Sequence, residues 1–196
     1  MSAPDKECVR AFFDRCAKNW DAEMVRNERI ISGILDRAGV AAGKSVLDVA
    51  CGTGVLIPDY LERKVGRITA IDLSPEMIRL AREKFRDKPV RFLTGDAEAE
   101  DFGESYDVIM VYNAFPHFSD PEGLITHLSG FLAPGGRLSI AHGMSRERIN
   151  AHHSGTARPV SAGLMEAEAL AALMGRFLKV ETVLSDEKQY QVVGRK

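Results

Sequence analysis

Two carboxylates and two glycines mark the first place in this chain where residue types and spacing point to chemistry. The segment S-V-L-D-V-A-C-G-T-G, residues 45–54, is a short apolar stretch that contains Asp48 and ends in a turn with Gly52 and Gly54. Asp72 follows Gly54 by 18 residues and ends a second apolar stretch. Glycine lets the backbone approach a ligand closely, and an acid at the end of the next strand accepts hydrogen bonds from the hydroxyls of a ribose. The pattern therefore indicates a nucleoside site in an α/β sheet.

The glycine spacing argues against a dinucleotide site. A dinucleotide-binding turn reads G-x-G-x-x-G, and its third glycine allows the helix to pack closely on the strand. The third position here is Ile57. A nicotinamide-dependent oxidoreductase of Rossmann type is accordingly disfavoured.

Five short signatures, in order along the chain, carry a resemblance to a known family. They are D-x-x-C-G-T-G at 48–54, L-S-P-E-M-I at 73–78, G-D-A at 95–97, Y-D-V-I at 106–109 and L-A-P-G-G-R-L at 132–138. In these segments the chain resembles the class I S-adenosylmethionine-dependent methyltransferases, and specifically the type 11, quinone-biosynthesis-like small-molecule branch. The resemblance spans residues 44–142. It implies S-adenosyl-L-methionine as cofactor, S-adenosyl-L-homocysteine as product, and a small molecule as methyl acceptor.

The resemblance also implies which residues bind the cofactor. The small-residue turn would lie under its methionine portion, with Asp48 near the ammonium group through water and the Asn113 carbonyl facing the ammonium and methyl groups. Asp72 would bind the ribose hydroxyls, and Asp96 the exocyclic amine of adenine. The full implied set is Asp48, Ala50, Cys51, Gly52, Thr53, Gly54, Asp72, Leu73, Met77, Asp96, Ala97 and Asn113. Structural roles stay open for Asp48 as a loop partner, Asp72 as an exposed strand-end acid, Met77 as a core residue and Asp96 as a turn cap.

Histidines and arginines gather after the expected fourth and fifth strands, where an open α/β sheet places its ligand crevice. Imidazole titrates near neutral pH and could deprotonate an acceptor as the methyl group arrives. The candidate catalytic residues are His117, His142 and His153, and the candidate substrate-binding residues are Trp20, Phe115, Arg146 and His152. The arginines suggest a polar or anionic acceptor. The alternatives are a packing role for His117 and a surface position for one of the adjacent residues His152 and His153.

Other partners are disfavoured. No H-x-x-x-H or C-x-x-C spacing supports a metal site. The N-A-F-P segment at 113–116 lacks the acid or amide, the two prolines and the aromatic residue typical of methylases that act on exocyclic amines of nucleic-acid bases. The net charge of −2 gives no excess of positive charge that would attract nucleic acid or an anionic membrane. We therefore expect a small-molecule partner, with no metal, nucleic acid or membrane, and the sequence leaves the oligomeric state open.

The bulk composition is typical of one soluble domain. A chain of 196 residues, 45% hydrophobic and 28% charged, has enough apolar residues for a single core. Cys8, Cys16 and Cys51 are interpreted as reduced thiols, which favours a cytoplasmic location. The polar N-terminus has no apolar signal core, and no apolar run is long enough to span a bilayer.

Apolar periodicity predicts a doubly wound α/β domain, with a mostly parallel sheet. Two helices are expected within 6–38, broken at 19–21, then strands and helices in alternation. The expected strands are 45–50, 67–72, 90–94, 106–112 and 137–142, and the expected helices are 55–64, one from Pro75, 122–132 and 166–176. The runs 178–184 and 189–194 flank a polar turn and predict an antiparallel hairpin. As one domain, 1–196, the chain would divide into a helical lid (1–43), a cofactor-binding core (44–142), a substrate-side insertion (143–165) and a terminal helix with the hairpin (166–196).

Three functions remain open. The favoured one is methyl transfer to a small molecule by in-line substitution, which depends mainly on positioning of the reactants. Because such a reaction has no obligate catalytic residue, a non-catalytic regulatory protein that binds S-adenosylmethionine is the second. The disfavoured oxidoreductase, which would bind NAD(P), is the third.

Overall fold

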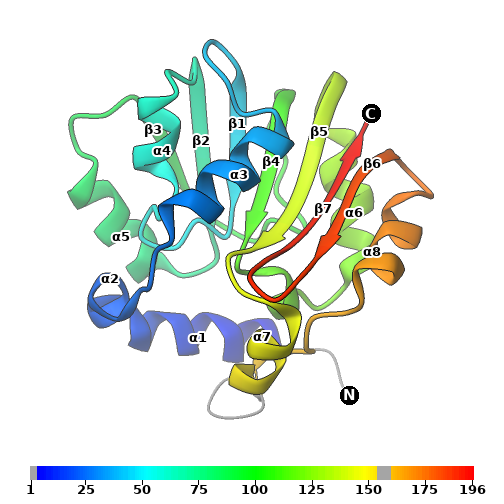
Figure 1. The fold of residues 1–196 in the computed structure, drawn as a ribbon. Helices are drawn as coiled ribbons and strands as arrows, with labels where there is room; N and C mark the ends of the chain where they lie inside the picture. Colours follow the sequence, from blue (N-terminus) through cyan, green and yellow to red (C-terminus); the bar gives the residue numbers. More distant parts are fainter. Residues whose placement is uncertain (1–3, 154–159) are drawn as a thin grey trace.

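One seven-stranded sheet forms the centre of the molecule (Figure 1). The structure is a computed structural model that describes residues 4–153 and 160–196, with the side chains of 152 and 153 left out. The strand order is β3-β2-β1-β4-β5-β7-β6, in which β1 to β5 are parallel and β7 is antiparallel to both β5 and β6. The strands are β1 (Ser45–Val49), β2 (Arg67–Asp72), β3 (Val90–Thr94), β4 (Tyr106–Tyr112), β5 (Leu132–His142), β6 (Lys179–Ser185) and β7 (Tyr190–Arg195). The predicted fold class and the C-terminal hairpin are confirmed.

Helices cover both faces of the sheet, because the central strands are apolar on both sides. In β1, Leu47 and Val49 face one buried cluster and Val46 faces the other, as the two-residue period of a strand requires. Helices α6 (Pro121–Gly130) and α8 (Ala167–Met174) supply the first cluster. Helices α3 (Glu28–Ala38), α4 (Ile57–Glu62) and α5 (Pro75–Lys84) supply the second. The predicted start of α5 is confirmed, because the Ser74 hydroxyl accepts a hydrogen bond from the Met77 N–H and Pro75 occupies the first turn.

The N-terminal segment lies across the end of the sheet where the parallel strands finish (Figure 1). It consists of α1 (Lys6–Cys16), the 3₁₀ turn η1 (Ala17–Asn19) and the short helix α2 (Trp20–Glu23). The predicted break at 19–21 is wrong, because Trp20 and Asp21 are helical and the chain becomes extended only at Met24. Just after this helix, the Arg26 guanidinium is bound to the Val55 carbonyl and, at 2.9 Å, to Asp59.

Two other boundaries differ from the expectation. The segment 132–137, expected as a turn before the fifth strand, belongs to β5, because Leu132 pairs with Tyr106 and the register then shifts to Arg137 opposite Val108. Helix α4 is shorter than the predicted 55–64, because the small-residue turn continues to Leu56.

Residues 143–153 and 160–166 connect β5 with α8 and lie beneath the sheet (Figure 1). Helix α7 (Arg146–His153) lies near α1, and after the undescribed residues the chain passes through 160–164 before α8 begins. Among the described residues no helix is both long enough and apolar enough to cross a membrane.

Candidate active site

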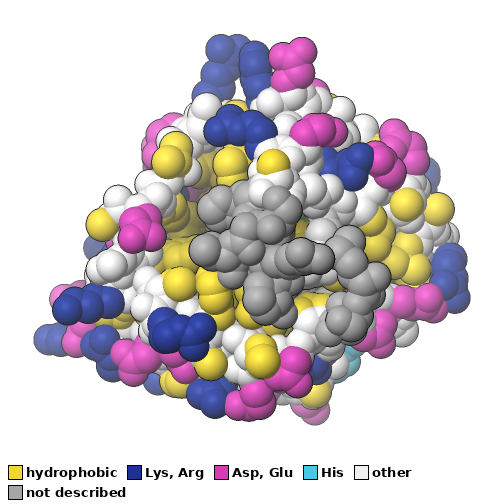
Figure 2. Space-filling model, turned by 90° about the horizontal axis from the view of Figure 1, so that it is seen from below, with side chains coloured by type: hydrophobic (Ala, Val, Ile, Leu, Met, Phe, Trp, Pro, Cys, Tyr) yellow, Lys and Arg dark blue, Asp and Glu magenta, His cyan; other side chains and the backbone are white. Residues whose placement is uncertain are grey.

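A cavity of about 1060 Å³, including its opening to solvent, lies at the carboxyl ends of β1, β2 and β4. In the view from below, hydrophobic side chains gather near the middle of this face and charged ones lie mostly toward its rim (Figure 2). Twelve of the residues singled out in the sequence line the cavity, namely Trp20, Asp48, Ala50, Cys51, Gly52, Asp72, Leu73, Met77, Asp96, Ala97, Asn113 and His117. The fold therefore brings together side chains from five separate segments.

The turn after β1 has an unusual backbone. Ala50, Gly52 and Gly54 all have positive φ, at 55°, 56° and 86°. The Cys51 N–H donates to the Ile71 carbonyl at 3.0 Å, which fixes the turn against β2. A side chain on Gly54 would begin 2.6 Å from the Phe85 ring, so only glycine fits there. The turn thus presents a bare backbone surface to the cavity.

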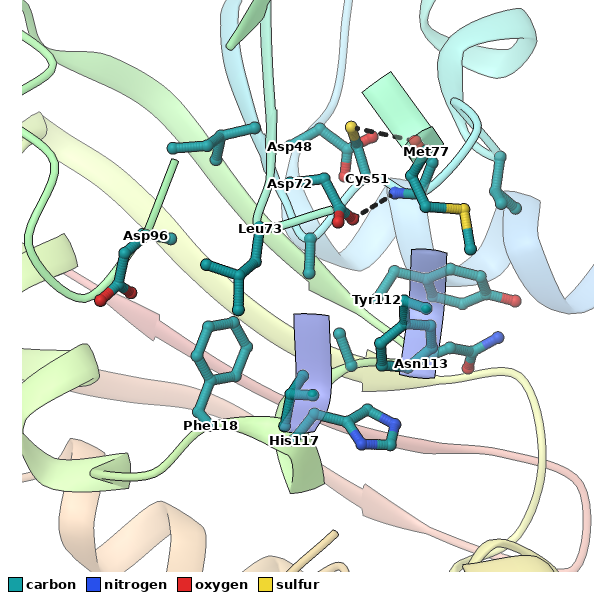
Figure 3. Close-up of a pocket in the computed structure, with 18 of the residues that line it drawn as sticks. Asp48, Cys51, Asp72, Leu73, Met77, Asp96, Tyr112, Asn113, His117 and Phe118 are labelled. Atoms are coloured by element: carbon teal, nitrogen blue, oxygen red, sulfur yellow. Dashed lines mark hydrogen bonds between the residues drawn. The ribbon is translucent and has the colours of Figure 1, made fainter. Parts of the chain in front are cut away.

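Asp72 anchors this turn and still faces the cavity. One carboxylate oxygen accepts from the Gly52 N–H at 2.8 Å (Figure 3), and the other accepts from the Ser74 N–H at 2.9 Å. Burial raises the pKa of Asp72 to about 6, although both N–H donors act in the opposite direction. Each oxygen retains capacity for a further hydrogen bond, which suits a pair of neighbouring hydroxyl groups.

Asp48 is a buried carboxylate with an unsatisfied oxygen. Its side chain is 2% exposed, and within the described residues Oδ2 has no hydrogen-bond partner. Burial and the nearby charge of Asp72 raise the pKa of Asp48 to about 8. Such a group favours a cationic ligand, because a positive charge would stabilise the carboxylate that burial disfavours.

The raised pKa of Asp48 predicts a specific pH dependence of stability. Between the unfolded value of 3.8 and the folded value of about 8, the folded protein holds a proton that the unfolded chain releases. Raising the pH through this interval therefore destabilises the ligand-free protein, by at most about 1.4 kcal/mol per pH unit. Asp48→Asn removes this dependence, so we expect its advantage over the wild type to increase by roughly 2–4 kcal/mol between pH 5 and pH 8.

Urea unfolding at pH 5 and pH 8 measures the difference. Asp87→Asn, a change at an exposed position, serves as the control and should follow the wild type. A constant difference between Asp48→Asn and the wild type at the two pH values would contradict the raised pKa.

Asp96 lies apart from Asp48 and Asp72, at the other end of the cavity (Figure 3). Its Oδ2 accepts from Nζ of Lys6 at 2.6 Å, and Lys6 also pairs with Glu98 at 2.7 Å. Its Oδ1 accepts from the Glu98 N–H at 2.9 Å. Asp96 therefore caps its own turn, as the structural alternative expected, and also faces the cavity.

Polar contacts hold the N-terminal segment over the cavity. Besides Lys6, Asp14 of α1 accepts from the Ser74 hydroxyl at 2.6 Å, and Asp21 of α2 binds both the Thr53 hydroxyl and Lys84 at 2.5 Å. An apolar cluster completes the contact and consists of Val9, Phe12, Phe13, Leu73 and Val160. The segment is therefore joined to the turn after β1, to α5 and to the region of Asp96.

Trp20 brings a buried donor to the turn after β1. Its indole Nε1 has no hydrogen-bond partner among the described residues. The same nitrogen lies 3.5 Å from the position that a Cβ of Gly52 would occupy. A side chain at Gly52 would therefore fill the space between the turn and this donor.

Asn113 and Tyr112 form the wall at the end of β4. Asn113 has φ of 55°, and its Oδ1 accepts from the Gly143 N–H at 2.9 Å. A Cβ on Gly143 would lie 2.4 Å from the Tyr112 hydroxyl, so Gly143 allows this tyrosine to pack beside the cavity.

His117 follows β4 on the 3₁₀ turn η2 (Phe115–His117) and lines the cavity. Its Nδ1 lies 2.7 Å from the Val160 carbonyl, and its ring packs edge to face against Phe13 at 5.0 Å. Burial lowers the pKa of His117, so the ring is neutral at pH 7. A carbonyl only accepts, so Nδ1 carries the proton and Nε2 carries the lone pair.

Several predicted residues do not line the cavity. Thr53, Gly54 and Phe115 are buried beside it. His142 is 2% exposed and packs its ring against Tyr190 at 6.0 Å, and Arg146 is paired with Glu166 and with the Leu164 carbonyl at 3.4 Å. The side chains of His152 and His153 lie outside the described residues. In the part of the chain that the structure describes, no three acidic, histidine or cysteine side chains are grouped as metal ligands would be.

The sequence interpretation also missed part of the lining. Among the residues concerned are Lys6, Val9, Met24, Glu98, Tyr112 and Phe118. For Val9 the helical spacing predicts a buried face of α1, but nothing local says which surface covers that face. Tyr112 was detectable, because it is the last residue of a predicted strand and precedes Asn113.

Comparisons with known proteins identify relatives of this chain. Residues 46–136 match the family model of a methyltransferase domain. Malonyl-[acyl-carrier protein] O-methyltransferase of Acetivibrio thermocellus is 34% identical over 140 residues, which are 70% of this chain and 50% of that protein. Demethylmenaquinone methyltransferase of Tropheryma whipplei is 32% identical over 144 residues, 67% of this chain and 57% of that protein. The chain thus spans little more than half the length of these curated relatives.

Solved structures extend the likeness over nearly the whole chain. The N-methyltransferase NodS of Bradyrhizobium japonicum, in complex with S-adenosyl-L-homocysteine, has a TM-score of 0.74 at 18% identity, over 96% of this chain and 98% of that one. A methyltransferase in complex with the Trm112 activator of Haloferax volcanii has a TM-score of 0.78 at 22% identity, over 93% and 96%. At these identities the likeness concerns the fold. With the family model and the curated relatives, it shows that this chain belongs to the class I S-adenosylmethionine-dependent methyltransferases.

Proposed function

We propose that this protein transfers a methyl group from S-adenosylmethionine to a hydroxyl group of a small molecule. The observation that carries the proposal is a pair of buried, unpartnered polar atoms of opposite kind on the cavity wall. Oδ2 of Asp48 is an acceptor and Nε1 of Trp20 is a donor, and within the described residues neither has a partner. An α-amino acid group supplies both complements, because its ammonium donates and its carboxylate accepts.

The remaining contacts are those that the family resemblance implies, for residues that line the cavity. Asp72 would bind the two ribose hydroxyls, and Asp96 at the far end would accept from the adenine amine while the Ala97 N–H donates to the ring. Leu73 and Met77 would flank the adenine. In this arrangement Trp20, which the sequence suggested for the acceptor, belongs to the cofactor-binding set.

The charge of the cavity supports a cationic nucleoside. Asp48, Asp72, Asp96 and Glu98 line it, and Lys6 is the one lysine or arginine in the described lining. When bound, S-adenosylmethionine supplies a methyl group on a positively charged sulfur, which leaves as a neutral thioether. The protein then has to align the acceptor with that methyl group and exclude water.

Among the described histidines, His117 is the one that lines the cavity. We propose that Nε2 takes the proton from the acceptor hydroxyl while the oxygen forms its bond to the methyl carbon and the carbon–sulfur bond breaks. The neutral ring supports this role, since burial keeps it unprotonated at pH 7. His142 and Arg146 are poorly placed for the roles that the sequence suggested, because both have partners away from the cavity.

The names of curated relatives suggest which kind of atom accepts the methyl group. Three of the curated relatives are named as O-methyltransferases, two acting on malonyl-[acyl-carrier protein] and one in ubiquinone biosynthesis. We therefore propose an oxygen acceptor, with α1 and α2 as the lid. The polar or anionic character expected from Arg146 and Arg148 has no support from the described cavity lining. The unpaired Cys8, Cys16 and Cys51 support a cytoplasmic location, which cell fractionation would test.

Titration calorimetry tests the cofactor assignment directly. We expect S-adenosylhomocysteine to bind with micromolar or tighter affinity and NAD to give no measurable heat. Release of S-adenosylhomocysteine from S-adenosylmethionine, followed across a panel of hydroxylated small molecules, then tests turnover. Binding of NAD in place of S-adenosylhomocysteine would overturn the proposal, and binding without turnover of any acceptor would favour a regulatory protein.

A further inference from the structure

The orientation of His117 depends on a segment that is remote in sequence. Its Nδ1 contacts the carbonyl of Val160, 43 residues later, at 2.7 Å. This contact selects the tautomer, because only a protonated Nδ1 can donate to a carbonyl. Imidazole that lacks such a partner distributes its proton between both nitrogens, and Nε2 then carries the lone pair only part of the time.

The segment 160–164 holds that carbonyl in place through side-chain and backbone contacts. The Val160 side chain is buried in the apolar cluster with Phe12, Phe13 and Leu73. The Ala162 N–H donates to the Pro116 carbonyl at 2.9 Å, which ties the segment to the turn that carries His117. The other end of the segment, at Leu164, is held by a residue of α7.

Asn150 of α7 is the residue that holds Leu164. Its Oδ1 accepts from the Leu164 N–H at 2.7 Å, and its Nδ2 donates to the Leu164 carbonyl at 3.1 Å. One side-chain amide thus satisfies both backbone groups of a residue that is 2% exposed. Arg146 adds a longer contact to the same carbonyl at 3.4 Å. Loss of the amide would leave the Leu164 N–H without this partner and loosen the segment.

We propose that Asn150 is a positioning residue for His117, which acts by holding the segment 160–164 so that the Val160 carbonyl fixes the proton on Nδ1. Asn150 does not line the cavity and contacts neither the proposed cofactor site nor His117. Its effect is therefore on the tautomer and position of the base and not on cofactor binding. The inference rests on the proposed function, in which Nε2 of His117 takes the acceptor's proton.

Nitrogen-15 NMR of the histidine rings tests this without knowledge of the acceptor. The protein is saturated with S-adenosylhomocysteine, and the His117 signals are identified by their loss in His117→Asn. In the wild type we expect Nδ1 protonated and Nε2 unprotonated. In Asn150→Ala the ratio of the Nδ1–H to the Nε2–H tautomer should fall by about tenfold, the equivalent of one lost hydrogen bond.

Two variants sharpen the experiment. Asn150→Asp keeps an acceptor for the Leu164 N–H but loses the donor to its carbonyl, so it should shift the ratio in the same direction by a smaller amount. Glu147→Gln, an exposed change on the same helix, should leave the ratio unchanged.

The outcomes separate the inference from the proposed function. A folded Asn150→Ala that keeps the wild-type tautomer ratio would overturn the inference, and if that variant does not fold, an unchanged ratio in Asn150→Asp would do so. Failure of the wild type to bind S-adenosylhomocysteine would instead overturn the proposed function. In that case the histidine ring signals of the ligand-free protein would still test the role of Asn150.

Discussion

Asp72→Ala should bind S-adenosylhomocysteine at least 100-fold more weakly than the wild type. In the proposed complex its carboxylate accepts hydrogen bonds from two ribose hydroxyls, and bonds to a charged group contribute about 1.5–3 kcal/mol each. The carboxylate also accepts from the Gly52 and Ser74 N–H groups, so the same change removes the anchor of the turn under the methionine portion. Titration calorimetry at pH 8, where the carboxylate is ionised, measures the loss.

Two comparisons separate the ribose contact from general damage. Asp72→Asn retains one acceptor oxygen and the shape of the side chain, so its loss of affinity should be smaller than that of the alanine variant. Glu83→Ala changes an exposed acid on α5 and should bind as the wild type does. Binding by a folded Asp72→Ala within threefold of the wild type would show that the second strand's acid does not hold the ligand.

His117→Asn should lower kcat by about 10²–10⁴-fold, the usual contribution of a positioned general base, with little change in cofactor affinity. Asparagine is the matched replacement, because its side-chain nitrogen can reproduce the donation of Nδ1 to the Val160 carbonyl while the position of Nε2 is lost. The assay is release of S-adenosylhomocysteine with an acceptor found in the screen of hydroxylated compounds.

The pH profile provides a second readout for His117. The base acts in its neutral form and burial lowers its pKa, so wild-type kcat should persist to pH values below 6.5 and fall only at lower pH. The variant should lack that acidic limb if its residual rate depends on no other base. A kcat for His117→Asn within threefold of the wild type would assign His117 to packing alone.

The cofactor side of the cavity was predictable because it is encoded locally. The turn at Gly52 and Gly54 must follow a strand, and Asp72 must end the next one, so parallel pairing alone places Asp72 beside the turn. Asp48, Asp72, Asn113 and residues 50–52 of the turn accordingly line the cavity, whereas Thr53 and Gly54 do not.

The acceptor side was less predictable, because position after a strand does not decide which way a side chain faces. His142 ends β5 on the same face as Ile140, because alternate residues of a strand face the same side of the sheet. Its ring therefore packs against Tyr190. This two-residue alternation could be recognised from the sequence. The pairing of Arg146 with Glu166 was not, because it depends on how the connection after β5 folds back on α8.

One small apolar cluster joins helix α1 to the segment 160–164. Val9, Phe12 and Phe13 belong to the helix above the nucleoside end, whereas Val160 belongs to the segment that orients the histidine. If α1 moved away from the cavity, Val160 would lose its contacts with the side chains of α1. If Val160 moved, the side of α1 that faces it would become exposed. In the proposed complex, displacement of α1 on ligand entry would therefore change the packing around Val160, whose carbonyl contacts His117.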